Sequence, residues 1–221
     1  MGQSPQGVLE NQAVTQTTVL SEAPSFRTDP ITGLPIVGGF FGVGKKGKVE
    51  LRLIFDRRPQ NATERRLRWG VLPQASQLRH IILKPRESLI GDGDDLSVYF
   101  YRLDHEPDWY KHNAVGESLM GDWLGEFGGA PNESYFMCMT VWGMGDLNSA
   151  DAAQRVHEQI IADSGVLIAQ NQLRFDQPLP DGPQYVGVYL DDLLLVHKSL
   201  TAQLARGATP NASAINRIES S

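Results

Sequence analysis

The 221-residue sequence contains a single cysteine, Cys138. One cysteine excludes an internal disulfide framework and a cysteine-rich zinc site, and a lone Cys among apolar neighbours is typical of a small buried hydrophobe. The five histidines show no zinc-ligand spacing, and nothing in the sequence indicates a nucleophilic triad. No stretch reaches the roughly 18 to 20 consecutive apolar residues of a membrane helix, and the N-terminus lacks the basic and apolar regions of a signal peptide. These absences favour a soluble intracellular protein.

Charge is distributed unevenly along the chain. The formal net charge is −6, but residues 45–88 hold twelve Lys or Arg against four acids, a net of +8, so the remainder carries −14. Such segregation predicts a basic lobe that faces a polyanion and an acidic lobe that holds cations. A charge run is also typical of an ordinary solvated surface, so this feature alone decides no function.

Local patterns predict an α+β fold. Residues 40–56 place apolar stretches around a Gly/Lys-rich turn, as in a β-hairpin. The apolar run 79–85 is typical of a buried strand, and the aromatic segment 95–103 is β-prone, although a strand that leads into a short helix would have the same pattern. Residues 148–165 combine helical apolar spacing with an Asn/Ser start and a Gly stop, which predicts a helix. A shorter helix is expected over 198–206.

The stretch VGVYLDDLLLV, residues 186–196, places two adjacent carboxylates, Asp191 and Asp192, inside apolar sequence. Two short strands joined by a turn at YLDD explain the pattern. Adjacent carboxylates repel each other and lose solvation when buried, so they persist mainly where a cation or a shared proton compensates. A metal site is therefore the functional interpretation, and an exposed turn, in which Asp is common, is the structural one.

Four segments occur in the order, and with plausible separations, that reverse transcriptases show. RLIFDRRPQN (52–61) resembles the R-x-x-x-D-x-R-x-x-N element of their fingers, and DLSVYF (95–100) resembles motif A. GDLNSADAAQ (145–154) resembles motif B of retrotransposon polymerases, G-x-x-N-x-x-x-x-x-Q, and YLDD (189–192) resembles motif C, YxDD. Each motif alone is common by chance. Together they make the chain similar to the reverse transcriptase domain, fingers and palm, of a retrotransposon- or retrovirus-like polyprotein.

This resemblance implies a polymerase palm, an antiparallel sheet backed by helices, with a basic fingers extension. The implied activity is that of an RNA-directed DNA polymerase, which needs two hard cations clamped by carboxylate oxygens. Asp95, Asp191 and Asp192 are the implied catalytic and metal-binding residues, and Mg²⁺ or Mn²⁺ is the implied cofactor. The implied partners are an RNA or DNA template-primer and a dNTP.

The resemblance also assigns substrate contacts, including an aromatic gate that excludes a ribose 2′-hydroxyl. The implied nucleotide-binding residues are Lys45, Lys46, Arg52, Phe100 and Gln154. The implied template-binding residues are Arg58, Asn61, Gly145 and Asn148. A core aromatic is the competing interpretation of Phe100, and a solvated helix residue that of Gln154. Asp94 is a rival to Asp95 as the metal ligand, and Tyr99 would then take the place of Phe100 as the gate.

The expected organisation is a flexible leader (1–28), a fingers-like region (29–90), a palm-like region with the catalytic motifs (91–205) and a disordered tail (206–221). The sequence ends soon after YLDD, without room for a thumb, so the isolated chain is expected to hold template-primer weakly. Two functions stay open at this point. One is an active reverse transcriptase domain, and the other is a decayed or domesticated fragment that keeps the fold without polymerase activity. An RNA-dependent RNA polymerase is disfavoured, because motif C of those enzymes is usually GDD.

Overall fold

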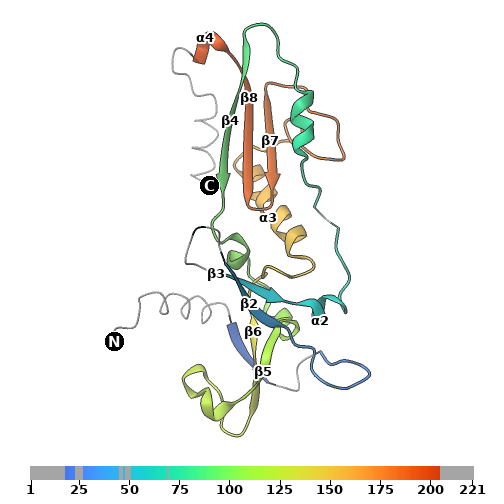
Figure 1. The fold of residues 1–221 in the computed structure, drawn as a ribbon, viewed down its shortest axis with the longest axis vertical. Coiled ribbons are helices and arrows are strands. Elements are labelled where there is room, and N and C mark those ends of the chain that lie inside the picture. Colours follow the sequence, from blue (N-terminus) through green and yellow to red (C-terminus); the bar gives the residue numbers. More distant parts are fainter. Residues whose placement is uncertain (1–17, 23–26, 45–46, 48–50, 69, 205–221) are drawn as a thin grey trace, which may run out of the picture. The chain divides into compact units, whose positions relative to one another are not determined.

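The computed structural model of the chain describes residues 18–22, 27–44, 47, 51–68 and 70–204 (Figure 1). Its strands are β1 (Thr18–Glu22), β2 (Gly39–Gly44), β3 (Leu51–Asp56), β4 (Glu87–Asp95), β5 (Ala114–Met120), β6 (Ser134–Met139), β7 (Gln184–Tyr189) and β8 (Asp192–Leu200). Its α-helices are α2 (Arg58–Asn61), α3 (Ser149–Asp163) and α4 (Thr201–Leu204). Its 3₁₀ helices are η2 (Ala75–His80), η3 (Tyr99–Arg102), η4 (Pro107–His112), η5 (Gly121–Trp123) and η6 (Gly125–Phe127). Antiparallel sheets with a few helices make this an α+β fold, as predicted.

The chain divides into two compact units, and each unit is built from two stretches of sequence. Unit 1 comprises residues 1–66 and 100–149, and unit 2 comprises residues 67–99 and 150–221. These bounds differ from the contiguous fingers-like and palm-like regions that the motifs led us to expect. The chain leaves unit 1, returns to it and leaves it again, so the segments resembling motifs A and B are each shared between the units.

Unit 1 contains a three-stranded sheet with strand order β1-β6-β5 and the separate pair β2-β3 (Figure 1). The antiparallel pair β2-β3 confirms the hairpin predicted over residues 40–56. β1 pairs with β6 along its whole length. The prediction of a flexible leader is therefore wrong for residues 18–22, because β6 offers them backbone hydrogen-bonding partners. The remainder of that prediction over 1–17 and 23–26, and the predicted tail 206–221, lie outside the described residues.

Apolar side chains from β3, β5 and β6 form the core of unit 1. Phe55, Val115, Met139 and Val141 pack together and are 3% exposed or less. Cys138 of β6 is fully buried in a separate apolar cluster of the same unit. Burial raises the pKa of the Cys138 thiol to about 12, so the thiol stays protonated and behaves as the small hydrophobe expected from the sequence.

His105 packs against tryptophan side chains in unit 1. The ring centroid of His105 lies 4.2 Å from that of Trp142 and 6.2 Å from that of Trp109. Burial lowers the pKa of His105 to about 3, and the nearby positive charge of Arg57 acts in the same direction. His105 is therefore neutral at pH 7 and serves as a core residue.

Unit 2 is built on a three-stranded antiparallel sheet with strand order β4-β8-β7 (Figure 1). β7 and β8 form the hairpin predicted around YLDD, and α3 is the helix predicted over 148–165. Side chains on one face of the sheet, among them Val186 and Leu195, form a buried cluster with Ile161 of α3. Val196 and Tyr185, on the other face, pack against Leu173. Both faces of the hairpin are thus buried, which explains its continuous apolar sequence.

Three other segments of unit 2 can be compared with the elements predicted from the sequence. The prediction of a strand over 79–85 is wrong, because η2 extends to His80. The apolar residues Leu78 and Ile81 contact the core and are three positions apart, as on a helical turn. Ile82, in contrast, is 80% exposed. In 95–103, β4 ends at Asp95 and η3 follows, which confirms the alternative of a strand leading into a short helix. α4 lies within the helix expected over 198–206, although β8 extends to Leu200.

No helix in the part of the chain that the structure describes is both long enough and apolar enough to span a membrane.

Candidate functional site

The three predicted metal ligands lie at one end of the unit 2 sheet. Asp95, the last residue of β4, is directly opposite Asp192, the first residue of β8. Asp191 occupies the β7-β8 turn, and its carbonyl oxygen accepts a hydrogen bond of 2.9 Å from the Leu96 backbone N–H. The tertiary structure therefore brings the backbone of residues that are almost 100 positions apart in sequence to the same end of one sheet.

The strand register also distinguishes Asp95 from its rival Asp94. Residues directly opposite each other in an antiparallel pair point to the same face of the sheet. Asp95 therefore shares a face with Asp192, whereas Asp94 is opposite Leu193 and shares the face that packs on α3. Asp94 also accepts a 2.9 Å hydrogen bond from the backbone N–H of Asp95. Of the two, Asp95 is the residue that the sheet places with the YLDD carboxylates.

The donor set suits Mg²⁺ in chemistry, because hard divalent cations prefer carboxylate oxygens. Among the residues that the structure describes, however, no three His, Cys, Asp or Glu side chains lie close enough together to hold a metal ion. The backbone of Asp95, Asp191 and Asp192 lies at one end of the sheet, but their side chains do not converge on a common point. Asp95 and Asp192 are exposed, and Asp191 is half-buried.

The turn that carries Asp191 has an unusual backbone. Leu190 has φ 56°, in the left-handed region that residues other than glycine seldom adopt. Its N–H donates to the side-chain oxygen of Gln154 at 2.8 Å, and its carbonyl oxygen lies 2.6 Å from Nδ1 of His157. Gln154 and His157 belong to α3 and are 1% and 2% exposed. No sequence pattern indicates His157 as a residue of this site, since its spacing from Gln154 gives no sign of a contact with a turn 33 residues away.

The sequence assigned Gln154 and Phe100 to the nucleotide. The structure buries both, Phe100 at 8% exposure, and commits the Gln154 carboxamide to the turn. Tyr99, the alternative gate, is 6% exposed, and its hydroxyl donates to the carbonyl oxygen of Ala153 at 2.9 Å. Burial raises the pKa of Tyr99 to about 12, and the negative charge of Asp191 contributes to the shift. The nucleotide-binding roles of Gln154 and Phe100 stay predictions.

In unit 1, the structure joins the fingers-like motif to the start of the motif B segment. The side-chain amide of Asn61 donates to the carbonyl oxygen of Gly145 at 2.8 Å, and its oxygen accepts from the backbone N–H of Leu147 at 3.0 Å. Gly145 has φ 111°, and a Cβ atom there would lie 2.0 Å from the carbonyl oxygen of Phe55. Asn148 is 6% exposed, and its amide donates to the carbonyl oxygen of Arg65 at 3.2 Å. Close packing explains these residue types, and their template-binding roles stay predictions.

The remaining predicted contacts lie around the β2-β3 hairpin. Arg58 is exposed and makes hydrogen bonds of 2.8 and 2.6 Å to the two carboxylate oxygens of Asp56, which lowers the pKa of Asp56. Arg52 lies in β3 opposite Val43. Lys45 and Lys46 lie outside the described residues. An exposed guanidinium such as that of Arg58 is accessible to a phosphate, so its predicted role is compatible with its position.

Arg57, the residue between Asp56 and Arg58, has a structural role that was not predicted from the motifs. Its side chain has 0% exposure and forms ion pairs with Asp146 at 2.5 Å and Glu64 at 2.6 Å. It also donates to the carbonyl oxygen of His112 at 3.2 Å. Arg57 therefore links three segments of unit 1, and no local pattern in the sequence distinguishes this buried arginine from the exposed one that follows it.

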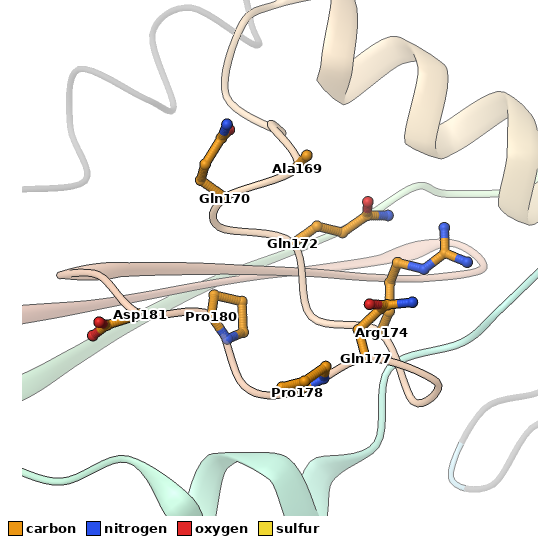
Figure 2. A pocket seen from close by; sticks show the side chains of 8 residues that line it. All are labelled: Ala169, Gln170, Gln172, Arg174, Gln177, Pro178, Pro180 and Asp181. Carbon is orange, nitrogen blue, oxygen red and sulfur yellow. The ribbon is translucent and has the colours of Figure 1, made fainter.

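The structure also shows a cavity of about 340 Å³ within unit 2, on the loop that precedes β7 (Figure 2). Gln170, Gln172, Arg174, Gln177 and Asp181 are among its lining residues. Arg174 is already paired with Asp176 at 3.1 Å, and Gln172 donates to Glu158 at 3.2 Å. None of the residues predicted from the motifs lines this cavity, so it adds nothing to the candidate site.

Comparison with known proteins bears on the fold. The sequence matches no protein-family model and no curated protein. Among solved structures it is similar to a foamy viral protease-reverse transcriptase determined in complex with double-stranded DNA, with a TM-score of 0.51 and 13% sequence identity. The fold resembles that of a viral reverse transcriptase. The match covers 96% of this chain and 26% of the viral chain, so this chain spans about a quarter of the length of the protein it matches. At this identity, the likeness concerns the fold alone.

Proposed function

We propose that the chain is a nucleotidyltransferase domain of the reverse transcriptase type, an RNA-directed DNA polymerase of a retroelement. One observation carries the proposal: the sheet register places Asp95 opposite Asp192 and beside Asp191, at the end of a helix-backed antiparallel sheet. The order of the motifs along the sequence predicts the same juxtaposition. Similarity to the fold of a viral reverse transcriptase supports the proposal independently of the motifs.

In this proposal, Asp95, Asp191 and Asp192 hold Mg²⁺ or Mn²⁺. Ions held by these carboxylates would supply Lewis-acid chemistry for the primer hydroxyl and charge neutralisation for the leaving pyrophosphate. The proposed contribution of the chain itself is to hold the backbone of these three residues at one end of the sheet. The pairing of β4 with β8 and the bond between Leu96 and Asp191 keep them there.

The proposed partners are an RNA or DNA template-primer and a dNTP. The segment 45–88, with its net charge of +8, supplies a sequence-independent attraction for phosphate groups. Within it, Lys45, Lys46 and Arg52 are proposed to bind the triphosphate, and Arg58 to bind the template backbone. The viral protein of similar fold was solved with double-stranded DNA, which supports nucleic acid as the class of partner.

Primer extension on an RNA template tests the proposal. The purified chain is expected to extend the primer with Mg²⁺ or Mn²⁺, and Asp191→Asn and Asp192→Asn are expected to reduce extension to background. Asp94→Asn is the matched control, because it removes the same charge next to Asp95 but on the other face of the sheet. Extension that survives loss of both Asp191 and Asp192 would refute the two-metal site.

A second candidate function is a nucleic-acid-binding domain that has lost polymerase activity. The observation that favours it is the absence, within the described residues, of three metal-ligating side chains gathered at one point. This candidate predicts template binding that weakens with salt, no extension at high protein concentration with either metal, and no effect of Asp192→Asn on binding. Titration with Mn²⁺ separates the two, because only the enzyme requires a metal ion at these carboxylates.

A further inference from the structure

We propose that Gln154 and His157 are positioning residues that hold Leu190 in its left-handed conformation and so direct Asp191 and Asp192 at the end of the sheet. The consequence for catalysis rests on the proposed function. The mechanical part, a helix that holds a strained turn, rests only on the contacts within unit 2.

The strain at Leu190 is the first step. Its φ of 56° places Cβ close to the following carbonyl group, which costs free energy for every residue except glycine. A two-residue turn of this kind usually carries Gly or Asn, whose conformational preferences suit it. Leucine therefore stays in this conformation only if the surrounding structure compensates, and strained residues of this kind gather at functional sites.

The Gln154 carboxamide supplies one part of the compensation. Its nitrogen donates to the carbonyl oxygen of Val188 at 2.8 Å and to the carboxylate of Glu158 at 3.0 Å, while its oxygen accepts from the Leu190 N–H at 2.8 Å. A carbonyl and a carboxylate can only accept, and a backbone N–H can only donate, so one orientation of the amide satisfies all three partners. In place of Gln154, a glutamate side chain would lack the N–H donors to Val188 and Glu158, and a methionine side chain would make none of the three hydrogen bonds. At 1% exposure, water has no access to replace them.

His157 supplies the other part. Its Nδ1 lies 2.6 Å from the carbonyl oxygen of Leu190, and since a carbonyl only accepts, Nδ1 must carry a hydrogen. The residue lies three positions after Gln154, on the same face of α3. Both backbone polar groups of Leu190 are therefore bonded by one helix. The bond from Leu96 to the carbonyl oxygen of Asp191 secures the turn from the β4 side.

This arrangement makes the direction of the two carboxylates depend on α3. If the bonds to α3 are lost, Leu190 is expected to relax from its left-handed conformation, and the peptide group that bears the Asp191 carbonyl rotates with it. The Leu96 N–H then loses its acceptor. Hydrogen exchange of the Leu96 amide, followed by NMR, therefore reports the conformation of the turn without any requirement for polymerase activity.

The experiment is a double-mutant cycle on Gln154 and Leu190. Gln154→Met removes three hydrogen bonds, of which one restrains Leu190 directly, and loss of that one is expected to accelerate exchange of the Leu96 amide about tenfold. Leu190→Gly alone should change the rate less than about twofold, because glycine adopts φ 56° without strain. In the Gln154→Met background, Leu190→Gly should return the rate most of the way to that of the parent chain. A merely structural role of Gln154 in packing would show no such rescue.

Gln159→Met is the matched control, since Gln159 lies on the exposed side of α3 and its side chain donates to Asp163 in the same helix. The Val186 amide, bonded to Asn171, is the internal reference for global destabilisation. If Gln154→Met accelerates exchange at both amides equally, His157→Phe, which removes a single bond, replaces it in the cycle. An unchanged Leu96 rate in the Gln154→Met or His157→Phe variant, or a rate that Leu190→Gly raises further, would overturn the proposal.

The outcome is distinguishable from that of the proposed function. Loss and rescue of Leu96 protection without any primer extension would support the positioning role and refute the polymerase activity. Where both hold, the affinity for Mn²⁺ is expected to fall about tenfold in Gln154→Met and to recover with Leu190→Gly, as the exchange rate does.

Discussion

The buried arginine of unit 1 allows a prediction about stability whose size follows from its surroundings. Arg57 is fully buried and neutralises two carboxylates, those of Asp146 and Glu64, at 2.5 and 2.6 Å. Arg57→Met keeps much of the side-chain volume but leaves both carboxylates buried without their counterion. Removing one member of a buried ion pair costs about 3 to 5 kcal/mol, because the remaining charge has lost both its hydration and its counterion. With an unfolding slope of about 2 kcal/mol per M urea, the midpoint should fall by about 2 M.

Arg58→Met is the control for this prediction. Arg58 is the next residue, its side chain is 87% exposed, and it also pairs with a carboxylate, at 2.6 Å. Solvent screens such a pair, so the cost of its loss should stay below about 1 kcal/mol. Urea unfolding followed by tryptophan fluorescence gives both values. The triple variant Arg57→Met, Asp146→Asn, Glu64→Gln should recover most of the loss. Equal effects at positions 57 and 58, or no recovery in the triple variant, would refute the assignment of the cost to unpaired buried charge.

Two further predictions concern unit 1. The pKa of His105 is about 3 in the folded chain against 6.5 in the unfolded one, so between these values the unfolded state binds the extra proton and stability falls as the pH falls. At pH 4.5 the loss should approach about 2.7 kcal/mol relative to pH 7, and His105→Phe should remove that part of the pH dependence in urea titrations. Gly145→Ala should prevent stable folding, since its Cβ would lie 2.0 Å from a backbone carbonyl oxygen, whereas Gly125→Ala, with open space around it, should be tolerated in the same thermal denaturation assay.

Local sequence patterns were sufficient for the elements whose stability depends on neighbouring residues. The helix over 148–165 and the hairpins at 40–56 and around YLDD all follow from apolar periodicity combined with turn or cap residues, signals that lie within one element. The motif order was likewise consistent with the strand register, in which Asp95 lies opposite Asp192, while the metal-binding role of these residues stays a prediction. The strand expected over 79–85 failed because an apolar run of this length does not reveal whether its residues reach the core by alternation or by helical turns.

Tertiary structure alone decided the features that depend on distant partners. β1 exists because β6, more than a hundred residues later, offers a sheet edge. Arg57 rather than Arg58 is buried because Asp146 and Glu64 converge on it, and Gln154 bonds to the Leu190 turn because α3 packs against the sheet. Composition and spacing do not encode such contacts locally. They form when distant segments pack together and exclude water. Each buried polar group must then form its hydrogen bond or ion pair with a group from another segment.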